Sequence, residues 1–500
     1  MTITLTGCLA LLGEAATPSD GPVDITIDDG RITRIAPAGK EQPEGEVIDA
    51  RSRLCTAGLI NGHHHSHEHF FKGRHENLPL ELWMNNVRPL NPIPFTERQV
   101  YLRTLIGAIE ALRSGTTTIV DDLNVSPTLD PRLVQAAIRA YEDIGIRAYV
   151  GITLFDRPFF RGMPFVDEMF PPDLLAELDA LPKPDGAALL DFARDLATTR
   201  HWSSNRVAYI AAPSAPQRCT DDFLRAIRAL ADETNTPAMI HVQETRLQAV
   251  AGPAMYGCTM VEHLGRIGFL KPATTVIHGV WLTPAEVDLL ARAGATVQHN
   301  PLSNLKLGSG IAPVRRLLDA GVNLSLGTDG CGSIETVNMQ AVVAAAALLH
   351  KLRGDDPARW VGAAEAWRAG TVGGARALGR GAELGAVEEG RIADLALYRL
   401  DSIPFVPLNN ARGQLVYGET GASLDTLLVG GEVVMRAGRL TRIDEAALIA
   451  EIGEAHRALL PAIERAEHDA QRITAAYVPI VARCRCMDLP PGTFQAVLEP

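Results

Sequence analysis

Apolar residues in the middle of the chain follow two alternating spacings. Short runs of β-branched and aliphatic residues are separated by longer segments, such as 97–115 and 221–234, in which apolar residues recur every three or four positions. The first spacing predicts strands and the second predicts amphipathic helices. The predicted strands are 54–63, 116–122, 146–153, 206–214, 237–244, 274–282, 295–301 and 323–330. Because repeated strand–helix units form parallel sheets with right-handed crossovers, this pattern predicts an α/β fold, a closed (β/α)8 TIM barrel over residues 57–380.

The two ends of the chain have a different pattern. Residues 1–56 and 381–440 contain short alternating strands separated by Gly and Asp turns. Neither segment has enough strands to bury a core alone, so we expect the two to pair into one small composite β-sandwich domain beside the barrel. Residues 441–500 have helical spacing followed by a Pro-rich tail. We expect a C-terminal helical extension of one or two helices on the outside of the barrel, available for a contact between subunits.

Two predicted connections are too long to be ordinary loops. They are residues 66–100, after the first predicted strand, and residues 154–205, after the third. In a barrel both follow the carboxyl ends of strands, where active sites lie. We therefore expect these segments to overhang the active-site face and to determine the choice of substrate.

The composition favours a globular protein outside the membrane. Of the 500 residues, 46% are hydrophobic and 21% charged, and 47 basic against 59 acidic residues give a formal net charge of −12. This balance, without a basic run, disfavours binding to nucleic acid. The first twenty residues do not resemble a signal peptide, and no apolar run is long enough to span a bilayer. The sequence thus predicts neither a nucleic-acid nor a membrane partner.

The cysteines indicate a reducing compartment. Seven of them are scattered along the chain, a number that is odd and small for this length. Such usage is typical of reduced thiols and predicts a cytoplasmic protein. Cys484 and Cys486 form a closely spaced pair, but a metal site of this type needs a second pair nearby, so reduced thiols are the favoured interpretation.

Polar residues interrupt the apolar runs at the carboxyl ends of several predicted strands. Residues 61–65 read Asn-Gly-His-His-His, and strand alternation places His63 and His65 on the same side, where both imidazoles reach one ion. The fifth, sixth and eighth predicted strands contribute His241, His278 and Asp329. One such residue is most often a core histidine or a turn aspartate. Several converging at one barrel mouth predict a metal site, because buried polar groups without a partner are costly.

These motifs resemble the amidohydrolase superfamily, in the branch that contains cytosine, guanine and S-adenosylhomocysteine deaminases and the triazine chlorohydrolases. The resemblance covers nearly the whole chain. It rests on residues 58–65 (GLINGHHH), 241–245 (HVQET), 278–282 (HGVWL), 299–310 (HNPLSNLKLGSG), 327–330 (GTDG) and 390–396 (GRIADLA). The motifs are specific for this branch and much less so for a substrate.

The resemblance implies one divalent metal ion, with zinc expected and iron or manganese as alternatives. Its ligands would be His63, His65, His241 and Asp329, with one position left for water. Binuclear members bridge two ions with a modified lysine on the fourth strand, and residues 206–214 contain no lysine. A single-metal site is therefore favoured.

The same resemblance implies the catalytic roles of three residues. Glu244 would move a proton from the water to the substrate nitrogen, while His278 and Asp329 would orient the hydroxide and stabilise the developing charge. The expected reaction is deamination of an amino-substituted nitrogen heterocycle of the purine, pyrimidine, pterin or triazine type. Hydrolysis of an acyclic amide, urea or carbamate C–N bond, or of a chloro-triazine, is the alternative, and a non-catalytic scaffold on the same fold is a third hypothesis.

The substrate contacts are less well defined. Members that act on adenosine-type substrates have a histidine in a Pro-His-Ser-Pro segment, whereas residues 212–216 read Ala-Pro-Ser-Ala-Pro, which disfavours nucleosides. The candidate contacts are His67, Trp83, Ser214 and Asn304. For three of them a structural role is the competing interpretation: a polar loop for His67, core packing for Trp83 and support of a loop for Asn304. The habit of the family implies a homodimer or homotetramer that acts on a small molecule.

Overall fold

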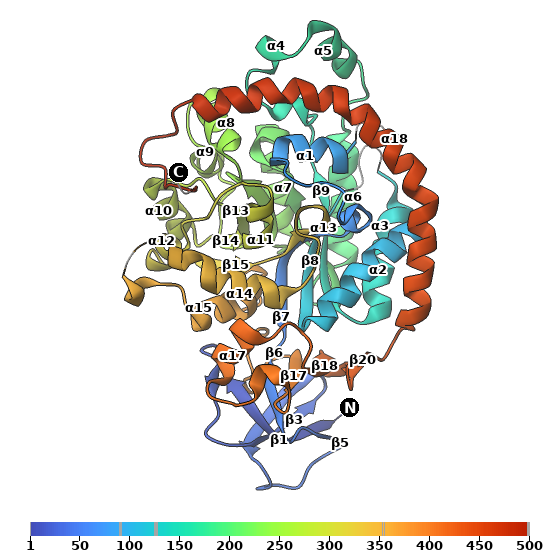
Figure 1. The fold of residues 1–500 in the computed structure, drawn as a ribbon, viewed down its shortest axis with the longest axis vertical. Helices are drawn as coiled ribbons and strands as arrows, with labels where there is room; N and C mark the ends of the chain where they lie inside the picture. The colour runs from blue at the N-terminus through green and yellow to red at the C-terminus, as the bar shows by residue number, and fades with distance from the viewer. Residues whose placement is uncertain (1, 90–92, 125–128, 353, 355, 498–500) are drawn as a thin grey trace.

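A ring of parallel strands surrounded by helices forms the central part of the protein (Figure 1). The computed structural model describes residues 2–89, 93–124, 129–352, 354 and 356–497. The barrel strands are β7 (Leu59–His65), β8 (Thr116–Leu123), β9 (Arg147–Leu154), β10 (Val207–Tyr209) with β11 (Ala212–Pro213), β12 (Ala238–Val242), β13 (Thr274–His278), β14 (Thr296–His299), and β15 (Asn323–Leu326) with β16 (Asp329–Gly330).

All pairings between neighbouring strands of the ring are parallel. A parallel bridge between Ala211 and Ala238 joins the fourth strand to the fifth, and β16 pairs with β7. These two contacts complete the ring. The expected TIM-barrel-like α/β fold is therefore confirmed, and each of the eight predicted strands overlaps an observed one.

The first predicted strand is wrong in one respect. Residues 54–63 do not form a single strand, because β6 (Arg53–Ala57) pairs antiparallel with β17 (Leu395–Arg399) outside the barrel, and β7 begins only at Leu59. Gly58 separates the two strands, and a Cβ atom at this position would overlap the side chain of Thr117. Both strands are buried on both faces, so their apolar residues form one continuous run in the sequence.

Helices cover the outside of the ring. They are α2 (Glu97–Arg113), α3 (Pro131–Ile144), α6 (Gly186–Thr199), α7 (Asp221–Glu233), α8 (Arg246–Tyr256), α9 (Met260–Arg266), α10 (Pro284–Ala293), α11 (Pro301–Lys306), α12 (Val314–Asp319), α13 (Cys331–Ile334), α14 (Met339–Leu349), α15 (Ala363–Arg368) and α16 (Gly374–Ala377). The helices predicted at 97–115 and 221–234 are confirmed. Thr96 begins the first with a capping box, and Thr220 caps the second through the amide of Phe223.

The two long connections contain short helices of their own. The first, residues 66–100, includes a 3-10 segment, η1 (Ser66–Phe71), and α1 (Leu80–Val87), and its residues 90–92 lie outside the described part. The second, residues 154–205, includes a 3-10 segment, η2 (Phe160–Gly162), α4 (Val166–Met169) and α5 (Pro172–Asp179). Both connections follow the carboxyl ends of barrel strands.

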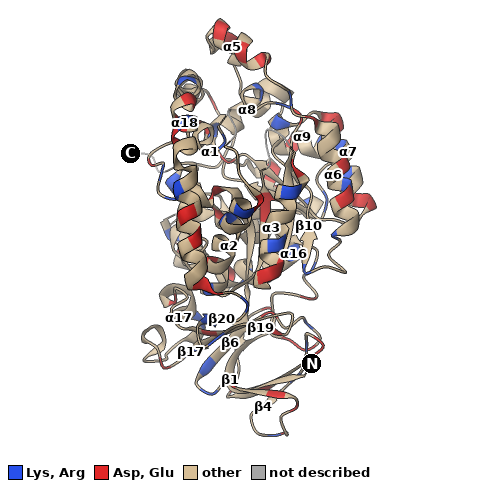
Figure 2. Ribbon diagram, turned by 90° about the vertical axis from the view of Figure 1, so that its right-hand side faces the viewer, with Lys and Arg blue, Asp and Glu red and all other residues tan. Residues whose placement is uncertain are grey.

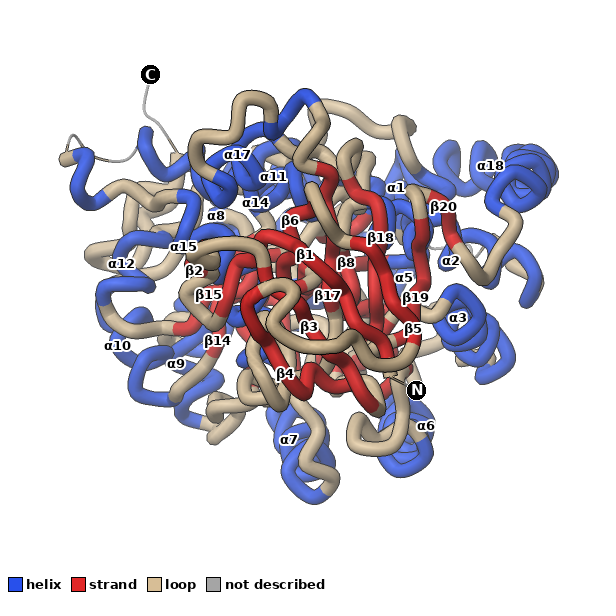
Figure 3. Tube along the Cα trace, turned by 90° about the horizontal axis from the view of Figure 1, so that it is seen from below, coloured by secondary structure: helices blue, strands red, loops and turns tan. Residues whose placement is uncertain are grey.

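The two flanks of the chain share a mixed sheet at the end of the barrel where β7 begins (Figures 1 and 3). Its strands are β1 (Ile3–Leu12), β2 (Thr17–Pro18), β3 (Val23–Asp28), β4 (Arg31–Pro37), β5 (Glu46–Asp49), β6, β17, β18 (Leu424–Val429), β19 (Glu432–Arg436) and β20 (Arg439–Leu440). β6 and β17 join the two flanks, and their apolar residues share one core. A buried bidentate ion pair between Arg147 of β9 and Asp394 attaches this sheet to the barrel.

One long helix, α18 (Glu445–Cys486), follows the last strand and continues through two internal prolines. It runs along the outside of the barrel past α2 and then over α1 and α8 (Figure 1). Its apolar side chains pack against both long connections. Acidic and basic residues alternate over the outer helices (Figure 2). None of the helices in the described ranges, α18 included, is apolar enough over a sufficient length to cross a bilayer.

Candidate metal centre

The carboxyl end of β7 supplies two histidines to the mouth of the barrel. His63 and His65 point into it, because side chains two positions apart on a strand share a face. His64 points to the other side, where its Nδ1 lies 3.2 Å from the carbonyl oxygen of Asp329 and its ring contacts His69. The strand therefore presents a pair of imidazoles in place of a row of three.

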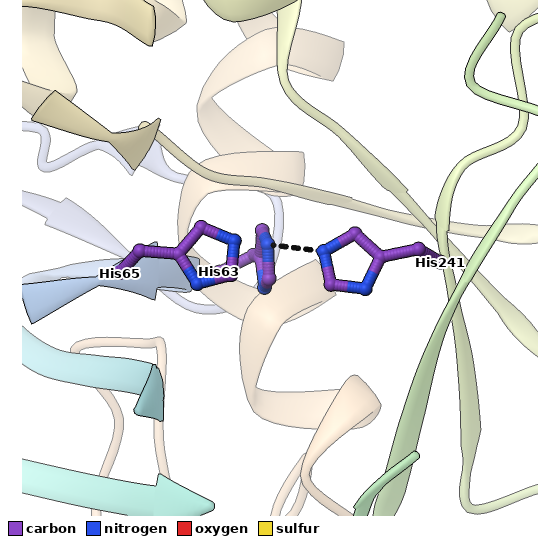
Figure 4. A group of neighbouring side chains, drawn as sticks. All are labelled: His63, His65 and His241. Carbon is purple, nitrogen blue, oxygen red and sulfur yellow. Dashed lines mark hydrogen bonds between the residues drawn. The ribbon is translucent and has the colours of Figure 1, made fainter. Parts of the chain in front are cut away.

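The rings of His63, His65 and His241 converge on one point (Figure 4). The Nε2 atoms of His63 and His241 are 3.2 Å apart. Oδ1 of Asp329 lies 3.3 Å from Nε2 of His65 and 3.6 Å from Nε2 of His63. Ligand atoms around a tetrahedral zinc ion at about 2.0–2.1 Å are separated by about 3.3 Å. The spacing of these four side chains thus fits one divalent ion.

Backbone carbonyls fix the orientation of two of these rings. Nδ1 of His65 lies 2.8 Å from the carbonyl oxygen of Asp122, and Nδ1 of His241 lies 2.8 Å from that of Ser214. Because each Nδ1–H donates to a carbonyl, each Nε2 lone pair faces the centre, as a metal ligand requires. Burial also lowers the pKa of both imidazoles well below the usual range, which keeps them neutral.

The backbone conformation of Asp329 and a hydrogen bond from a hydroxyl group fix the orientation of its carboxylate. Its φ of +66° is in the left-handed region, which non-glycine residues seldom occupy outside constrained sites. The hydroxyl group of Ser303 donates to Oδ2 at 2.8 Å, so Oδ1 faces the histidines. The neighbouring imidazoles hold the pKa of Asp329 well below its usual range, although burial alone would raise it.

Glu244 and His278 lie on the other side of Asp329. Nε2 of His278 is 3.4 Å from Oε2 of Glu244 and 3.8 Å from Oδ2 of Asp329. Burial, and then the charge of Asp329, raises the pKa of Glu244 well above its usual range, whereas burial lowers the pKa of His278 to about 4. A carboxyl group that is ready to exchange a proton therefore stands beside a neutral imidazole.

The four predicted substrate contacts occupy different places. His67 accepts the amide hydrogen of Asn124 at its Nδ1, and its ring lines a large cavity. Trp83 is buried, and its indole donates to the carbonyl oxygen of Gly332, but the side chain also lines a small cavity beside His65 and His241. Ser214 lines the small cavity too. Oδ1 of Asn304 is hydrogen-bonded to Nδ1 of His278, so Asn304 lies behind the imidazole of His278.

Two cavities adjoin the ligand cluster. The smaller, of about 50 Å³, is lined by Glu244, His278 and Asp329. The larger, of about 520 Å³, extends beneath the long connections and shares four lining residues with the smaller one, Met84, Arg88, Phe159 and Arg218. The two cavities are therefore adjacent, with these four side chains at the boundary between them.

Sequence reasoning missed several groups that support the ligands. Asp122 fixes His65 through its carbonyl group, and burial raises the pKa of its carboxyl group to about 6. The rule that identified Asp329, a carboxylate at a strand end, also applies to Asp122. Ser303 had no comparable signal, because its role depends on a tertiary contact with Asp329. Cys484 and Cys486 are free thiols, the first buried and the second exposed, so the metal interpretation of this pair gains no support.

Comparison with known proteins identifies the family. Residues 54–434 match the Amidohydrolase family. The chain belongs to this family. This amidohydrolase is 32% identical to the 5-methylthioadenosine/S-adenosylhomocysteine deaminase of Desulforudis audaxviator over 450 residues, which is 89% of this chain and 96% of the relative. It is 31% identical to the 5'-deoxyadenosine deaminase of Methanothermobacter thermautotrophicus over 436 residues, 87% and 94% of the two chains.

Solved structures of other enzymes have the same fold. An adenosine deaminase from Xanthomonas campestris with bound zinc superposes with a TM-score of 0.81 at 26% identity, over 92% of this chain and 98% of that one. The atrazine chlorohydrolase TrzN from Arthrobacter aurescens, complexed with zinc, gives a TM-score of 0.81 at 24% identity over 91% and 100% of the two chains. At 24% identity, the likeness to the chlorohydrolase shows a shared fold alone.

Proposed function

We propose that this amidohydrolase removes the exocyclic amino group of a nitrogen heterocycle by hydrolysis. The observation on which the proposal rests is the convergence of His63, His65, His241 and Asp329 on one point, with Glu244 beside it. The named relatives, which are deaminases of adenosine derivatives, support the same reaction. A scaffold protein would have no need for both the donor set and the adjoining carboxyl group.

The residues of the site account for the proton transfers that deamination needs. A divalent ion held by the four ligands would lower the pKa of a bound water towards neutrality. Glu244 accepts a proton from the attacking water and delivers it to the leaving nitrogen. As the C–O bond forms and the C–N bond breaks, one water is consumed and one ammonia is released. His278 and Asp329 hold the oxygen by hydrogen bonds beside the ring carbon.

We propose that the native ion is Zn²⁺, bound singly. Three neutral imidazoles and one carboxylate suit zinc, and the spacing of the ligand atoms is that of a tetrahedral site. Fe²⁺ and Mn²⁺ accept similar donors. Elemental analysis of protein purified without added metal tests this: about one zinc per chain is expected, and protein that is folded and free of transition metal contradicts it.

The relatives change the range of heterocycles to be tested. Ser214 stands where the resemblance leads one to expect a histidine in enzymes of adenosine-type substrates, which disfavours nucleosides. The named relatives nevertheless act on such nucleosides, which returns adenosine derivatives to the candidates. Ammonia release from adenosine derivatives, free purines, pyrimidines, pterins and triazines therefore tests the proposal. Amine release from aryl ureas and amides alone, or chloride release from chloro-triazines, would refute deamination and support the alternative reactions.

We also propose the domain boundaries 1–56 with 381–440, 57–380 and 441–500, with a β-sandwich formed by the first pair. The antiparallel pairing of β6 with β17, and the core that the two flanks share, support this division.

The seven free cysteines support a cytoplasmic location for the protein, since disulfides are rare in the cytoplasm.

We propose that the protein is a homodimer or homotetramer. Exposed apolar side chains near α17 (Ala411–Gly418) support an interface there, because monomers seldom leave such groups exposed together. They include Ile403, which is 92% exposed, and Val406, which is 62% exposed. Light scattering should give a multiple of the 53.7 kDa chain mass. An Ile403→Glu variant should have a smaller mass, and a wild-type protein of single-chain mass would refute the proposal.

A further inference from the structure

Three arginines that form no ion pair with any described carboxylate line the larger cavity. Arg88, at the end of α1, Arg103, on α2, and Arg218, after β11, all line it, and we call them the arginine triad. Much of the remaining wall is apolar, with Phe71, Phe155 and other aromatic side chains. The cavity wall thus combines apolar surface with several positive charges, whereas acidic and basic residues are balanced on the outer helices.

None of the three guanidinium groups forms an ion pair within the part of the chain that the structure describes, although the charge of Asp121 acts on Arg103 from farther away. Among the described residues, no carboxylate lies within ion-pair distance of any of the three guanidinium groups, and Asp130 and Asp179, at the cavity wall, pair with other arginines. The sequences at 90–92 (Leu-Asn-Pro) and 125–128 (Val-Ser-Pro-Thr) contain no acidic residue. Buried charges are normally paired, so the buried Arg103 and Arg218, with the half-buried Arg88 nearby, indicate a missing anion.

Aromatic rings hold two of these arginines in place. The guanidinium of Arg103 lies 4.4 Å from the ring centre of Phe95, and its Nε has no hydrogen-bond partner among the described residues. That of Arg218 lies 4.5 Å from the ring of Phe155, and its Nε donates to the carbonyl oxygen of Arg157. Such contacts orient a guanidinium but leave its charge unchanged.

Two arginines of the triad, Arg103 and Arg218, are buried and still charged. Arg103 is 5% exposed and Arg218 is 9% exposed, and burial lowers the pKa of each to about 10, so both remain protonated at neutral pH. The positive charge of Arg88 lowers the pKa of Arg218 further. An anion bound near Arg88 and Arg218 would reduce this unfavourable interaction between like charges.

We propose that the arginine triad binds an oxyanion, a carboxylate or a phosphate, that the substrate has at the end of an apolar arm. The proposal rests on the proposed function for the position of the heterocycle, which would occupy the smaller cavity. Arg88 and Arg218 line both cavities, so one molecule spans from Glu244 to the arginine triad. Guanidinium groups suit this task because they bind carboxylates and phosphates through paired hydrogen bonds.

Calorimetric titration of the full-length protein tests the proposal. The probes are 3-phenylpropionate and 4-phenylbutyrate, their neutral primary amides, phenyl phosphate and inorganic phosphate. We expect the aryl anions to bind and the amides to bind at least about tenfold more weakly, since charged hydrogen bonds are lost. Because carboxylates also bind zinc, each titration is done with zinc-loaded and with metal-free protein, and the binding should persist without metal.

Variants assign the binding to the arginine triad. Arg103→Met and Arg218→Met should each weaken aryl anion binding by about ten- to a hundredfold, and Arg218→Lys should restore part of it. Arg316→Met, on the exposed face of α12, is the matched control and should change nothing. Removal of an unpaired buried charge should leave the melting temperature equal or higher, so loss of binding would not reflect unfolding.

Several outcomes would overturn the proposal. Equal affinity for anions and amides, unchanged affinity in both methionine variants, binding that needs the metal, or binding of inorganic phosphate as tight as that of phenyl phosphate would each do so. The two proposals fail separately. If the arginine triad binds aryl anions but no heterocycle is deaminated, only the proposed function is wrong. If neutral heterocycles are deaminated and triad variants do not change KM for anionic analogues, only this inference is wrong.

Discussion

Replacement of Glu244 by glutamine separates proton transfer from metal binding. Glu244 is 3% exposed, its Oε2 lies 3.4 Å from Nε2 of His278, and it is not among the four ligands that we propose. Its backbone amide donates to the side chain of Gln248, which keeps the loop in place in the variant. Glutamine has the same shape and cannot take up a proton from water. The Glu244→Gln protein should therefore bind the metal normally and turn over slowly.

The expected loss follows from the task of the carboxyl group. A positioned acid–base group contributes about 10²–10⁴-fold to a rate, or about 3–5 kcal/mol in activation free energy. Burial, and then the charge of Asp329, raises the pKa of Glu244 well above its usual range, which favours its uptake of a proton from water. We therefore expect kcat to fall by about 10³-fold or more, with little change in the amount of zinc bound.

Ammonia release and elemental analysis measure the two quantities on the same samples. Glu233→Gln, the same chemical change on the outer helix α7, is the matched control and should keep full activity. A Glu244→Gln protein with full zinc content and unchanged kcat would remove Glu244 from the mechanism. A protein that has lost its zinc would show instead that Glu244 supports the ligands.

Four further predictions concern metal binding, positioning and stability. His241→Ala should reduce the bound zinc and the activity together. Added zinc should restore the activity of chelator-treated wild-type protein but not that of the variant. Restoration of activity in both proteins would exclude His241 as a ligand. Ser303→Ala frees Oδ2 of Asp329, so kcat should fall while zinc content stays near one per chain, and an unchanged kcat would contradict this role. Arg147→Ala leaves Asp394 buried without its partner and should lower the free energy of unfolding by about 3–5 kcal/mol. A loss below about 1 kcal/mol would show that the ion pair does not hold the flanking sheet to the barrel. In metal-free protein, the raised pKa of Glu244 makes its ionisation unfavourable in the folded state. The Glu244→Gln variant should therefore gain stability relative to wild type as the pH rises above about 4.3, the pKa of a glutamate in the unfolded chain. A difference in unfolding free energy that stays constant between about pH 4 and 8 would refute this.

Strand periodicity predicted the barrel because every strand end obeys the same rule. Apolar runs mark the buried strands, and the polar residue that ends each run marks the active-site face, which is how His241 and Asp329 were found 88 positions apart (329 − 241). The rule failed at residues 54–63, where two strands of different sheets are both buried and only Gly58 lies between them. Burial alone does not tell which sheet a strand joins.

Other features depend on contacts that no local pattern records. The C-terminal segment was expected as one or two helices, and it is one helix through Pro461 and Pro479, because packing against α1, α2 and α8 compensates for the lost backbone bonds. The arginine triad was not predicted either. Arginines in amphipathic helices usually face solvent, and only the tertiary fold turns Arg103 towards a cavity.

The course of α18 has a consequence for synthesis on the ribosome. Ala470, Ile473 and Tyr477 of this helix form part of the wall of the larger cavity, although Asp329, the last of the four proposed ligands along the chain, precedes them by more than 140 positions (470 − 329 = 141). A nascent chain that has completed all eight barrel strands therefore has an incomplete cavity wall with exposed apolar side chains until residue 477 has left the exit tunnel. The nascent chain should depend most on chaperones in this interval, and stop codons placed between residues 440 and 470 should yield aggregated protein that contains all four proposed ligands but lacks a closed cavity.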